Sequence, residues 1–234
     1  MSFGTPHRHF RRTDSTNTRA RELAAGGAPH GTVVTAAEQT EGRGRQGRSW
    51  TAPPGGALLY SAILRPLEQR HAMLPLAVPL AVCEAAEELA PGVECGVKWP
   101  NDIWLEARKL AGVLIEARPQ DGWAVIGVGL NLTISTEEFP PDLRDTAISL
   151  FGSSAKGRTA TAVLSRHLDR WVTADPETVL ATWRNRDVLR GREVSWEGGS
   201  GVADGIDDRG YLVVVTAAGD RVAVGAGEVH LRLG

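Results

Sequence analysis

Four short apolar segments follow one another between residues 94 and 132, and they restrict the fold of this chain more than any other feature. The segments read ECGVKW, DIWLEA, KLAGVLIEA and WAVIGVGLNL. Proline, asparagine, arginine and glycine, which favour turns, separate them. Short strands joined by such turns predict an antiparallel meander.

Helical and extended patterns share the rest of the first 188 residues. Helix start and stop signals and apolar spacing predict helices over four stretches: 17–25, 74–90, 164–174 and 179–189. Ser15 is the expected N-cap of the first helix. Apolar runs at 31–37 and 57–64 predict two more strands, and the segment 38–56 between them is expected to be a long loop. Loops longer than about 12 to 15 residues in a compact domain are usually functional or disordered.

After Gly191 the pattern changes to short strands only. The segments REVSW, GVADGI, YLVVVT, RVAV and EVHLRL are separated by turn residues. Five strands in about forty residues make a small barrel. We therefore expect a catalytic domain over residues 1–188 and a small C-terminal barrel over 189–234.

The composition excludes several classes of protein. No signal-peptide pattern follows the polar start, and no run reaches the roughly 20 apolar residues that cross a bilayer. Cys83 and Cys95 are expected to be buried thiols, and the six histidines show no metal-ligand spacing. A net charge of −2 argues against broad electrostatic binding to nucleic acid. We expect a cytoplasmic protein with neither a nucleic-acid nor a membrane partner.

Lysine is scarce in this chain. Of 26 basic residues only Lys98, Lys109 and Lys156 are lysines. Two of them fall within a dozen residues, which indicates positions where a compact ammonium is needed and a planar guanidinium does not serve.

The loop between the two early strands contains GRGRQGRSW, from Gly42 to Trp50. It matches G-x-G-x-x-G, but the prolines and glycines after Gly47 cannot begin the helix that a dinucleotide-binding fold requires there. Three arginines on a glycine-rich loop instead favour binding of phosphate or carboxylate. Trp50 offers a stacking face for a purine.

Two further motifs follow in the meander. In KWPND, Lys98 can neutralise phosphate, and Asp102 can hold magnesium or order the opposing cation. In KLAG and GVGLN, glycines interrupt apolar strands at Gly112 and Gly129, which often marks the approach of a ligand to the backbone. Asn131 can offer both a donor and an acceptor.

In order and spacing, these motifs resemble the biotin protein ligase family, and the likeness covers nearly the whole chain. It is carried by Ser15-Thr16-Asn17, Gly42 to Trp50, Lys98 to Asp102, Lys109 to Gly112 and Gly127 to Asn131. The resemblance implies an α+β fold of the class II synthetase-like kind: a mixed, largely antiparallel seven-stranded sheet backed by helices, then an SH3-like barrel. It is similar to the monofunctional type, since no segment before the first motif could hold a helix-turn-helix domain.

The resemblance also implies the roles of individual residues. The biotin-binding set is Ser15, Thr16, Asn17, Gln39, Gly42, Arg43, Gly44, Arg45, Lys109, Gly112 and Gly129. The ATP-binding set is Arg45, Arg48, Trp50, Lys98, Asn101, Asp102 and Asn131. The residues expected to take part in catalysis are Arg45, Lys98, Lys109 and Asp102. No fixed metal ligand is assigned, although Asp102 is the candidate for magnesium.

The implied reaction has two steps. ATP and biotin, with Mg²⁺, give biotinyl-5′-AMP, and the biotinyl group then passes to a lysine of a carboxylase carrier domain. Either Asp102 or Lys98 could assist that lysine. The expected protein is a monomer or a weak homodimer.

Three other functions compete with this one. Lipoate or octanoate protein ligases share the fold and the acyl-adenylate, but GRGRxGRxW, KWPND and the C-terminal barrel favour biotin. A biotin-responsive repressor needs a DNA-binding domain. A non-catalytic biotin-binding protein would have no need of the two lysines.

Overall fold

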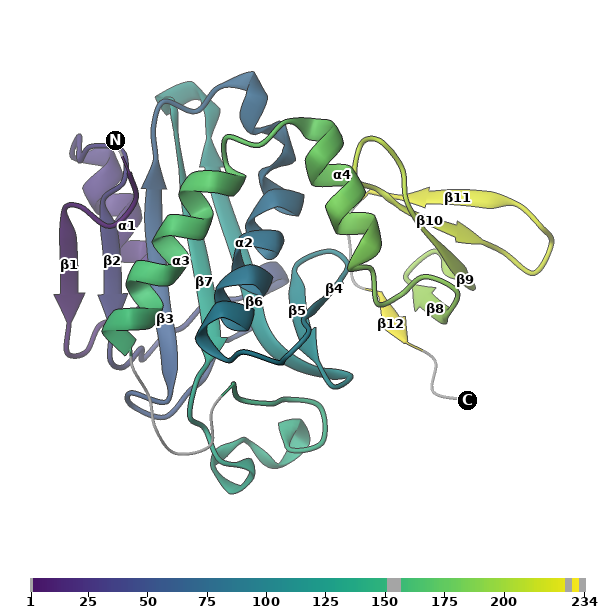
Figure 1. The fold of residues 1–234 in the computed structure, drawn as a ribbon, viewed down its shortest axis with the longest axis horizontal. Coiled ribbons are helices and arrows are strands. Elements are labelled where there is room, and N and C mark those ends of the chain that lie inside the picture. The colour runs from purple at the N-terminus through teal and green to yellow at the C-terminus, as the bar shows by residue number, and fades with distance from the viewer. Residues whose placement is uncertain (1, 151–156, 226–228, 232–234) are drawn as a thin grey trace.

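The computed structural model describes residues 2–150, 157–225 and 229–231. Its larger part is a seven-stranded mixed sheet in the order β1-β2-β3-β7-β6-β5-β4, with helices on both faces (Figure 1). The strands are β1 His7–Phe10, β2 Val33–Ala36, β3 Ala57–Leu64, β4 Gly96–Lys98, β5 Asp102–Leu105, β6 Arg108–Arg118 and β7 Trp123–Asn131. The predicted mixed, largely antiparallel sheet is confirmed.

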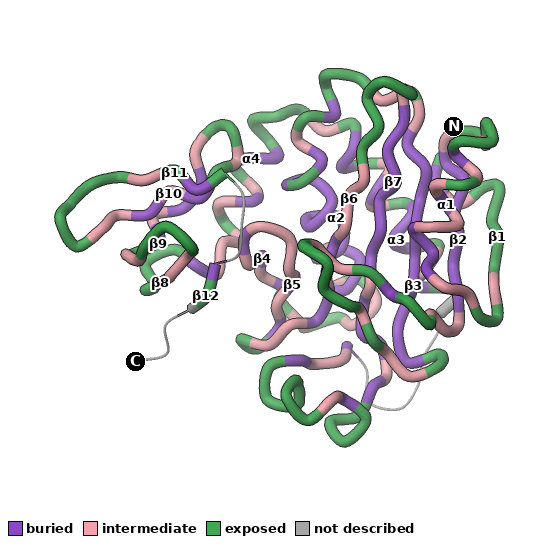
Figure 2. The backbone as a smooth tube through the Cα atoms, turned by 180° about the vertical axis from the view of Figure 1, so that it is seen from behind, coloured by how far each residue is buried: buried purple, intermediate pink, exposed green. Residues whose placement is uncertain are grey.

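The centre of the sheet is buried on both faces. All eight residues of β3 are buried, and β3 and β7 lie in the most enclosed part of the molecule in Figure 2. Strands β4 to β7 pair antiparallel in sequence order, which confirms the meander. In the β6–β7 pair Gly112 lies opposite Gly129.

Strand β1 was missed by the sequence analysis. It pairs parallel with β2 along the edge of the sheet, and its side chains are exposed or only partly buried. An edge strand of polar residues has no apolar alternation by which it could be recognised.

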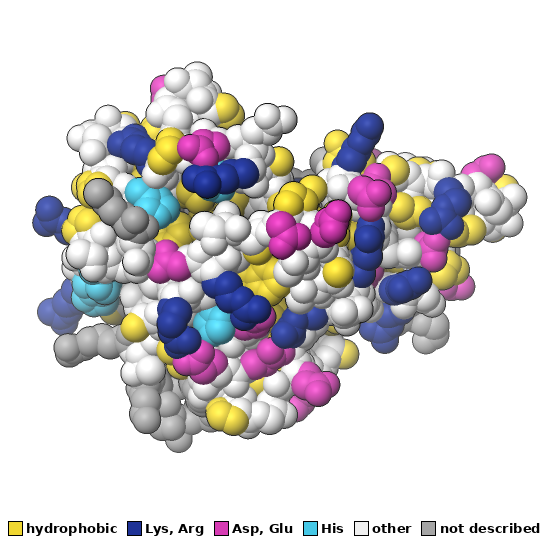
Figure 3. Space-filling model, turned by 45° about the horizontal axis from the view of Figure 1, so that its top comes forward, with side chains coloured by type: hydrophobic (Ala, Val, Ile, Leu, Met, Phe, Trp, Pro, Cys, Tyr) yellow, Lys and Arg dark blue, Asp and Glu magenta, His cyan; other side chains and the backbone are white. Residues whose placement is uncertain are grey.

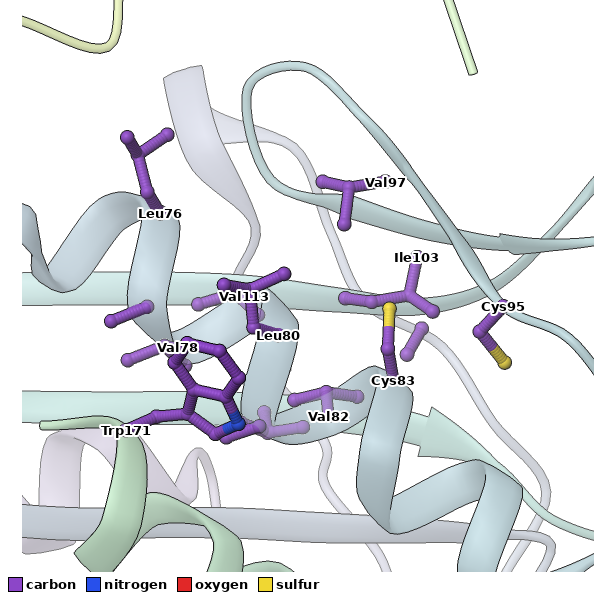
Figure 4. Close-up of a cluster of buried hydrophobic side chains, with 14 of the residues drawn as sticks. Leu76, Val78, Leu80, Val82, Cys83, Cys95, Val97, Ile103, Val113 and Trp171 are labelled. Carbon is purple, nitrogen blue, oxygen red and sulfur yellow. The ribbon is translucent and has the colours of Figure 1, made fainter. Parts of the chain in front are cut away.

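The helices are α1 Thr16–Ala25, α2 Leu74–Leu89, α3 Gly157–Trp171 and α4 Pro176–Asn185. Helix α1 packs on one face of the sheet, while α2 and α3 pack on the other. Figure 4 shows Leu80 of α2 next to Val113 of β6, and Trp171 of α3 beside the same helix. The free cysteines Cys83 and Cys95 are buried in the same core, as predicted.

Two predicted helices have different bounds in the structure. The helix expected over 164–174 runs over 157–171, and the one expected over 179–189 runs over 176–185. Pro176 occupies the first turn of α4, with Asp175 as its N-cap. Proline is tolerated at that position, so it starts this helix earlier than apolar spacing alone indicates.

The smaller part of the molecule is a five-stranded antiparallel sheet. Its strands are β8 Glu193–Trp196, β9 Gly199–Ile206, β10 Leu212–Val215, β11 Arg221–Val224 and β12 His230–Leu231, in the order β11-β10-β9-β8-β12. Nε1 of Trp99 donates to the carbonyl oxygen of Gly210 at 3.0 Å, which joins this sheet to the KWPND turn.

Charges of both signs are interspersed on the surface that carries α2 and α3 (Figure 3). There His167 of α3 lies between Glu84 and Glu88 of α2, with ring nitrogen to carboxylate distances of 3.1 and 2.9 Å. Within the described ranges, no helix combines the length and the apolar character needed to cross a membrane.

Candidate active site

A cavity of about 240 Å³ lies on the α1 face of the sheet, under the connection from β2 to β3. Of the residues that the sequence singled out, it is lined by Ser15, Thr16, Asn17, Gln39, Arg43, Gly44, Arg45, Arg48, Trp50, Asn101, Asp102, Lys109, Gly112, Gly129 and Asn131. Gly42 and Lys98 are the two that do not line it. The fold thus gathers segments separated by more than a hundred residues around one space.

The end of the cavity beside α1 is a hydrogen-bonded cluster of Thr16, Asn17, Gln39 and Ser61, here called the amide end. The backbone N–H and the hydroxyl of Thr16 both donate to Oε1 of Gln39, at 2.7 and 2.9 Å. Oγ of Ser61 donates to Oδ1 of Asn17 at 2.6 Å and lies 2.8 Å from Oγ1 of Thr16. Thr16, Asn17 and Ser61 are buried. These contacts fix the amide groups before any ligand binds.

Ser15 stands at the N-cap position of α1, as predicted, but its side chain makes no capping hydrogen bond. Its hydroxyl points to no helix N–H, although the residue is buried and lines the cavity. Asp14 instead accepts the backbone N–H of Ser15 at 2.7 Å and pairs with Arg19. The hydrogen bond from Arg19 lowers the pKa of Asp14 well below its ordinary value.

Glycines on β6 and β7 form the floor of the cavity. A Cβ atom at Gly127 would overlap Oδ1 of Asn17, and one at Gly129 would overlap the indole ring of Trp50. At Gly112 it would lie 3.1 Å from the same ring. The glycines within these strands are therefore explained by close approach of side chains to the backbone.

The loop from Gly42 to Trp50, here called the anion loop, forms a compact hairpin. The N–H of Trp50 donates to the carbonyl oxygen of Gly42 at 2.9 Å, and that of Gly44 to Arg48 at 2.7 Å. Gly47 at its tip has a φ of +75°, a conformation that glycine adopts without strain. Gly42 is buried at the base of this hairpin, against the carbonyl oxygen of Trp50 and the side chain of Gln39.

Trp50 lies over the glycine floor. Its ring centroid is 5.7 Å from Nζ of Lys109. Its Nε1 is buried and has no hydrogen-bond partner within the described part of the chain. A buried donor of this kind calls for an acceptor, and a ligand in the cavity can supply one.

The other end of the cavity is here called the cationic end and comprises Arg45, Arg48, Asp102 and Lys109. Nζ of Lys109 lies 2.7 Å from Oδ1 of Asp102, the only carboxylate among the described residues that line the cavity. Burial lowers the pKa of Arg45, an effect that neighbouring Arg48 reinforces and Asp102 opposes. This end therefore carries an excess of positive charge.

Lys98 lines a second, smaller cavity next to the cationic end. That cavity is shared with Arg45, Arg48 and Asp102 and reaches His230 of the small sheet. Nζ of Lys98 lies 5.1 Å from the ring centroid of Trp104. Burial lowers the pKa of Lys98, and the positive charges of Lys109 and Arg48 lower it further, against the opposite effect of Asp102.

The two asparagines expected at the nucleotide have structural partners. Nδ2 of Asn101 donates to the carbonyl oxygen of Val113 at 2.8 Å, and Nδ2 of Asn131 donates to that of Ile148 at 3.1 Å. Both side chains thus fix neighbouring backbone as well as line the cavity.

Sequence reasoning missed several residues of the site. Ser61 was passed over, although a serine within the apolar run ALLYSAIL is a signal of a polar contact. Glu116, which hydrogen-bonds Asn17, carried no such signal. Nor did the segment that closes one wall of the cavity with Phe139, Leu143, Thr146 and Ala147.

Two family profiles match this chain. The Biotin/lipoate A/B protein ligase family matches residues 9–132, and the Biotin protein ligase C terminal domain matches residues 189–232. The second match agrees with an SH3-like barrel at the C-terminal end.

Individual relatives span most of the chain. The biotin–[acetyl-CoA-carboxylase] ligase of Mycobacterium tuberculosis is 39% identical over 94% of this chain and 87% of its own length. The bifunctional ligase/repressor BirA of Bacillus spizizenii is 33% identical over 88% of this chain and 68% of its own. Among solved structures, the biotin protein ligase from Aquifex aeolicus in complex with biotin and ATP superposes with a TM-score of 0.81 at 27% identity, covering 98% of this chain and all of that one (100%).

Proposed function

This chain belongs to the biotin/lipoate protein ligase family and is a biotin protein ligase, and we propose how its residues divide the reaction. The enzyme forms biotinyl-5′-AMP from biotin and ATP and transfers the biotinyl group to a lysine of a biotin carboxyl carrier domain. The division of roles rests on one observation, which is that the two ends of the cavity differ in charge. Its amide end consists of neutral side chains that hydrogen-bond one another, while its other end is cationic.

At the amide end, the neutral ureido ring of biotin meets donors and acceptors that are already fixed. We assign it to Ser15, Thr16, Asn17 and Gln39. Ser61 hydrogen-bonds the side chains of Thr16 and Asn17. Preorganised polar groups bind a ligand without the cost of ordering them at that moment.

At the cationic end, the biotin carboxylate attacks the α-phosphorus of ATP, and pyrophosphate leaves. Lys109 is held by Asp102 in this structure, and a substrate carboxylate would compete for the same ammonium group. Arg45, Arg48 and Lys98 face the phosphates. Trp50 covers the adenine, and its buried Nε1 would donate in the plane of the indole to an acceptor beside that ring. Such a site works by positioning and electrostatic stabilisation, with no protein nucleophile.

Magnesium would enter with the nucleotide. Within the described ranges, no group of three or more histidine, cysteine or carboxylate side chains could hold a metal ion. A single carboxylate, Asp102, fits an ion that is bound mainly by phosphate oxygens, as is common for Mg²⁺. An ion bound there would supply further positive charge to the phosphates.

In the second step, the acceptor lysine must lose a proton before its amine attacks the carbonyl carbon of the mixed anhydride and AMP leaves. We assign the proton to Asp102 rather than Lys98. A carboxylate can accept it directly, whereas Lys98 lies among cations in the adjoining cavity.

The anhydride must be protected from water between the two steps. The anion loop already crosses the cavity and places Trp50 on its floor. We propose that this loop retains the intermediate and that it is more mobile without ligand.

The division of the chain also stands as a proposal, with residues 1–188 as the catalytic domain and 189–234 as the C-terminal domain. The hydrogen bond from Trp99 to Gly210 joins the smaller part to the KWPND turn, and the ion pair from Arg184 to Asp208, at 2.7 Å, joins it to α4.

The deciding experiment is exchange of pyrophosphate into ATP by the purified protein with magnesium. It is run separately with biotin, with lipoate and with no acid. Exchange with biotin alone supports the proposal, and exchange with lipoate alone would move the protein to the sister activity. No exchange with either acid would favour a binding protein without catalytic activity.

A further inference from the structure

Glu116 lies at the far end of β6, on the same face as Gly112 and Leu114, because alternate residues of a strand share a face. Gly112 and Leu114 line the cavity, and Glu116 lines the groove beside it. Strand β5 pairs with β6 only as far as Gly112. Beyond that point, Val113 to Glu116 line a groove opposite Arg43 to Gly47 of the anion loop.

The two carboxylate oxygens of Glu116 have different partners. Oε2 accepts Nδ2 of Asn17 at 2.9 Å. Oε1 lies 3.1 Å from Nη1 of Arg21 and 3.4 Å from Nη1 of Arg43. One side chain thus contacts the amide end with one oxygen and the anion loop with the other.

From these contacts we propose that Glu116 is a positioning residue that couples binding of the biotin ring to closure of the anion loop. The proposal rests on the function proposed above. Through Oε2, Glu116 keeps Nδ2 of Asn17 turned away from Ser61, so that Oδ1 points to the hydroxyl. Through Oε1, it draws Arg43, and with it the loop, toward β6.

The two contacts of Glu116 differ in how exposed their partners are, and we therefore expect them to affect different properties. The side chain of Glu116 is 20% exposed and that of Arg43 is 43% exposed, so the ion pair adds little to folding stability. Its effect is expected in the lifetime of the bound intermediate. The hydrogen bond to the buried Asn17 is the contact that affects biotin affinity.

Two substitutions divide these effects. Glu116→Gln keeps an acceptor for Asn17 but removes the charge that faces Arg43. We expect release of biotinyl-AMP to become about two- to fivefold faster, with the KM for biotin changed by less than about twofold. Glu116→Ala removes both contacts, and we expect the KM for biotin to rise by about five- to tenfold as well.

Arg21→Ala is the matched control. Arg21 faces the same oxygen of Glu116 but belongs to α1 rather than to the loop. The substitution Arg21→Ala should leave both the release rate of biotinyl-AMP and the KM for biotin near those of the unchanged enzyme. Double-mutant cycles on the release rate sharpen the comparison. The effects of Arg43→Ala and Glu116→Gln should not be additive, because both remove the same ion pair. The effects of Arg21→Ala and Glu116→Gln on that rate should be additive.

The measurements are the KM for biotin in pyrophosphate exchange and the rate at which labelled biotinyl-AMP leaves the enzyme in an excess of unlabelled biotin. Thermal unfolding shows which variants are folded. Equal release from the unchanged enzyme and Glu116→Gln, or equal effects of Arg21→Ala and Glu116→Gln, would overturn the coupling role. A failure of the unchanged enzyme to exchange with biotin would instead contradict the proposed function.

Discussion

The two ends of the cavity differ in how their polar groups are paired. At the amide end, Thr16, Asn17, Gln39 and Ser61 hydrogen-bond one another and are mostly buried. At the cationic end, one carboxylate faces several cations, and the arginines stand on a partly exposed loop. A neutral ring can be recognised by a rigid network of donors and acceptors. Charges that move during a reaction need groups able to exchange one partner for another.

Strand β7 contributes one glycine to each end of the cavity. Gly127 leaves room for Asn17 at the amide end, and Gly129 leaves room for Trp50, to which we assign the adenine. They lie on the same face of one strand, so the contrast between the two ends can be tested with matched substitutions.

The largest effect is expected at Lys109. Lys109→Ala removes the ammonium that faces Asp102 and that we propose binds the biotin carboxylate. We expect adenylation to lose roughly 2 to 4 kcal/mol of transition-state stabilisation, which is about 30- to 1000-fold in kcat/KM. Lys109→Arg should also fail, because a planar guanidinium does not replace a point charge. An unchanged rate of pyrophosphate exchange would contradict the assignment.

Arg45 tests the role of the loop in retaining the intermediate. Arg45→Gly removes a charged donor at the cationic end, and we expect biotinyl-AMP to escape about ten- to a hundredfold faster. The escaped anhydride should label lysines of unrelated proteins, detected by blotting. Labelling confined to the carrier domain would show that Arg45 does not retain the intermediate.

Gly127→Ala tests whether the amide end is rigid. The added Cβ overlaps Oδ1 of Asn17, and overpacking of this kind costs about 1 to 3 kcal/mol. We expect the KM for biotin to rise by about tenfold or more, with the KM for ATP nearly unchanged. Equal changes in both constants would mean that the two ends are not independent.

Gly129→Ala is the counterpart on the side of the cavity that we assign to the nucleotide. Its Cβ overlaps the indole ring of Trp50, but that ring stands on a surface loop and can shift. We expect a smaller rise, about three- to tenfold, in the KM for ATP, through weaker stacking on adenine. A larger rise in the KM for biotin than in the KM for ATP would contradict our assignment of Trp50 to the adenine.

The smallest effect is a change in pH dependence at Lys98. Burial lowers the pKa of Lys98 below its ordinary value of 10.5, so rising pH removes its charge earlier than that of a free lysine. Adenylation should therefore decline on the alkaline side below that value. In Lys98→Arg the charge persists, so the alkaline limb of the activity that this variant keeps should lie at higher pH. Identical alkaline limbs in the two proteins would exclude Lys98 as the titrating group.

Much of the fold was predictable from the sequence. The strand 57–64 and the meander follow from apolar runs between turn residues, and the structure has them where expected. The start of α4 was not predicted, because proline and its N-cap Asp175 outweigh apolar spacing there. Strand β1 is held by pairing with β2, a contact that leaves no mark on a polar edge segment.

The sequence by itself determined the chemical groups of the site. Two lysines in an arginine-rich chain, a glycine-arginine loop and glycines within strands are local features, because each reflects the need for one side chain or one close approach. Only the tertiary structure decided which groups meet. The pairing of β6 with β7 sets Gly112 opposite Gly129 under Trp50. The contact from Asn17 to Glu116 joins residues 99 positions apart. Such contacts depend on strand register and helix packing, which no local pattern specifies.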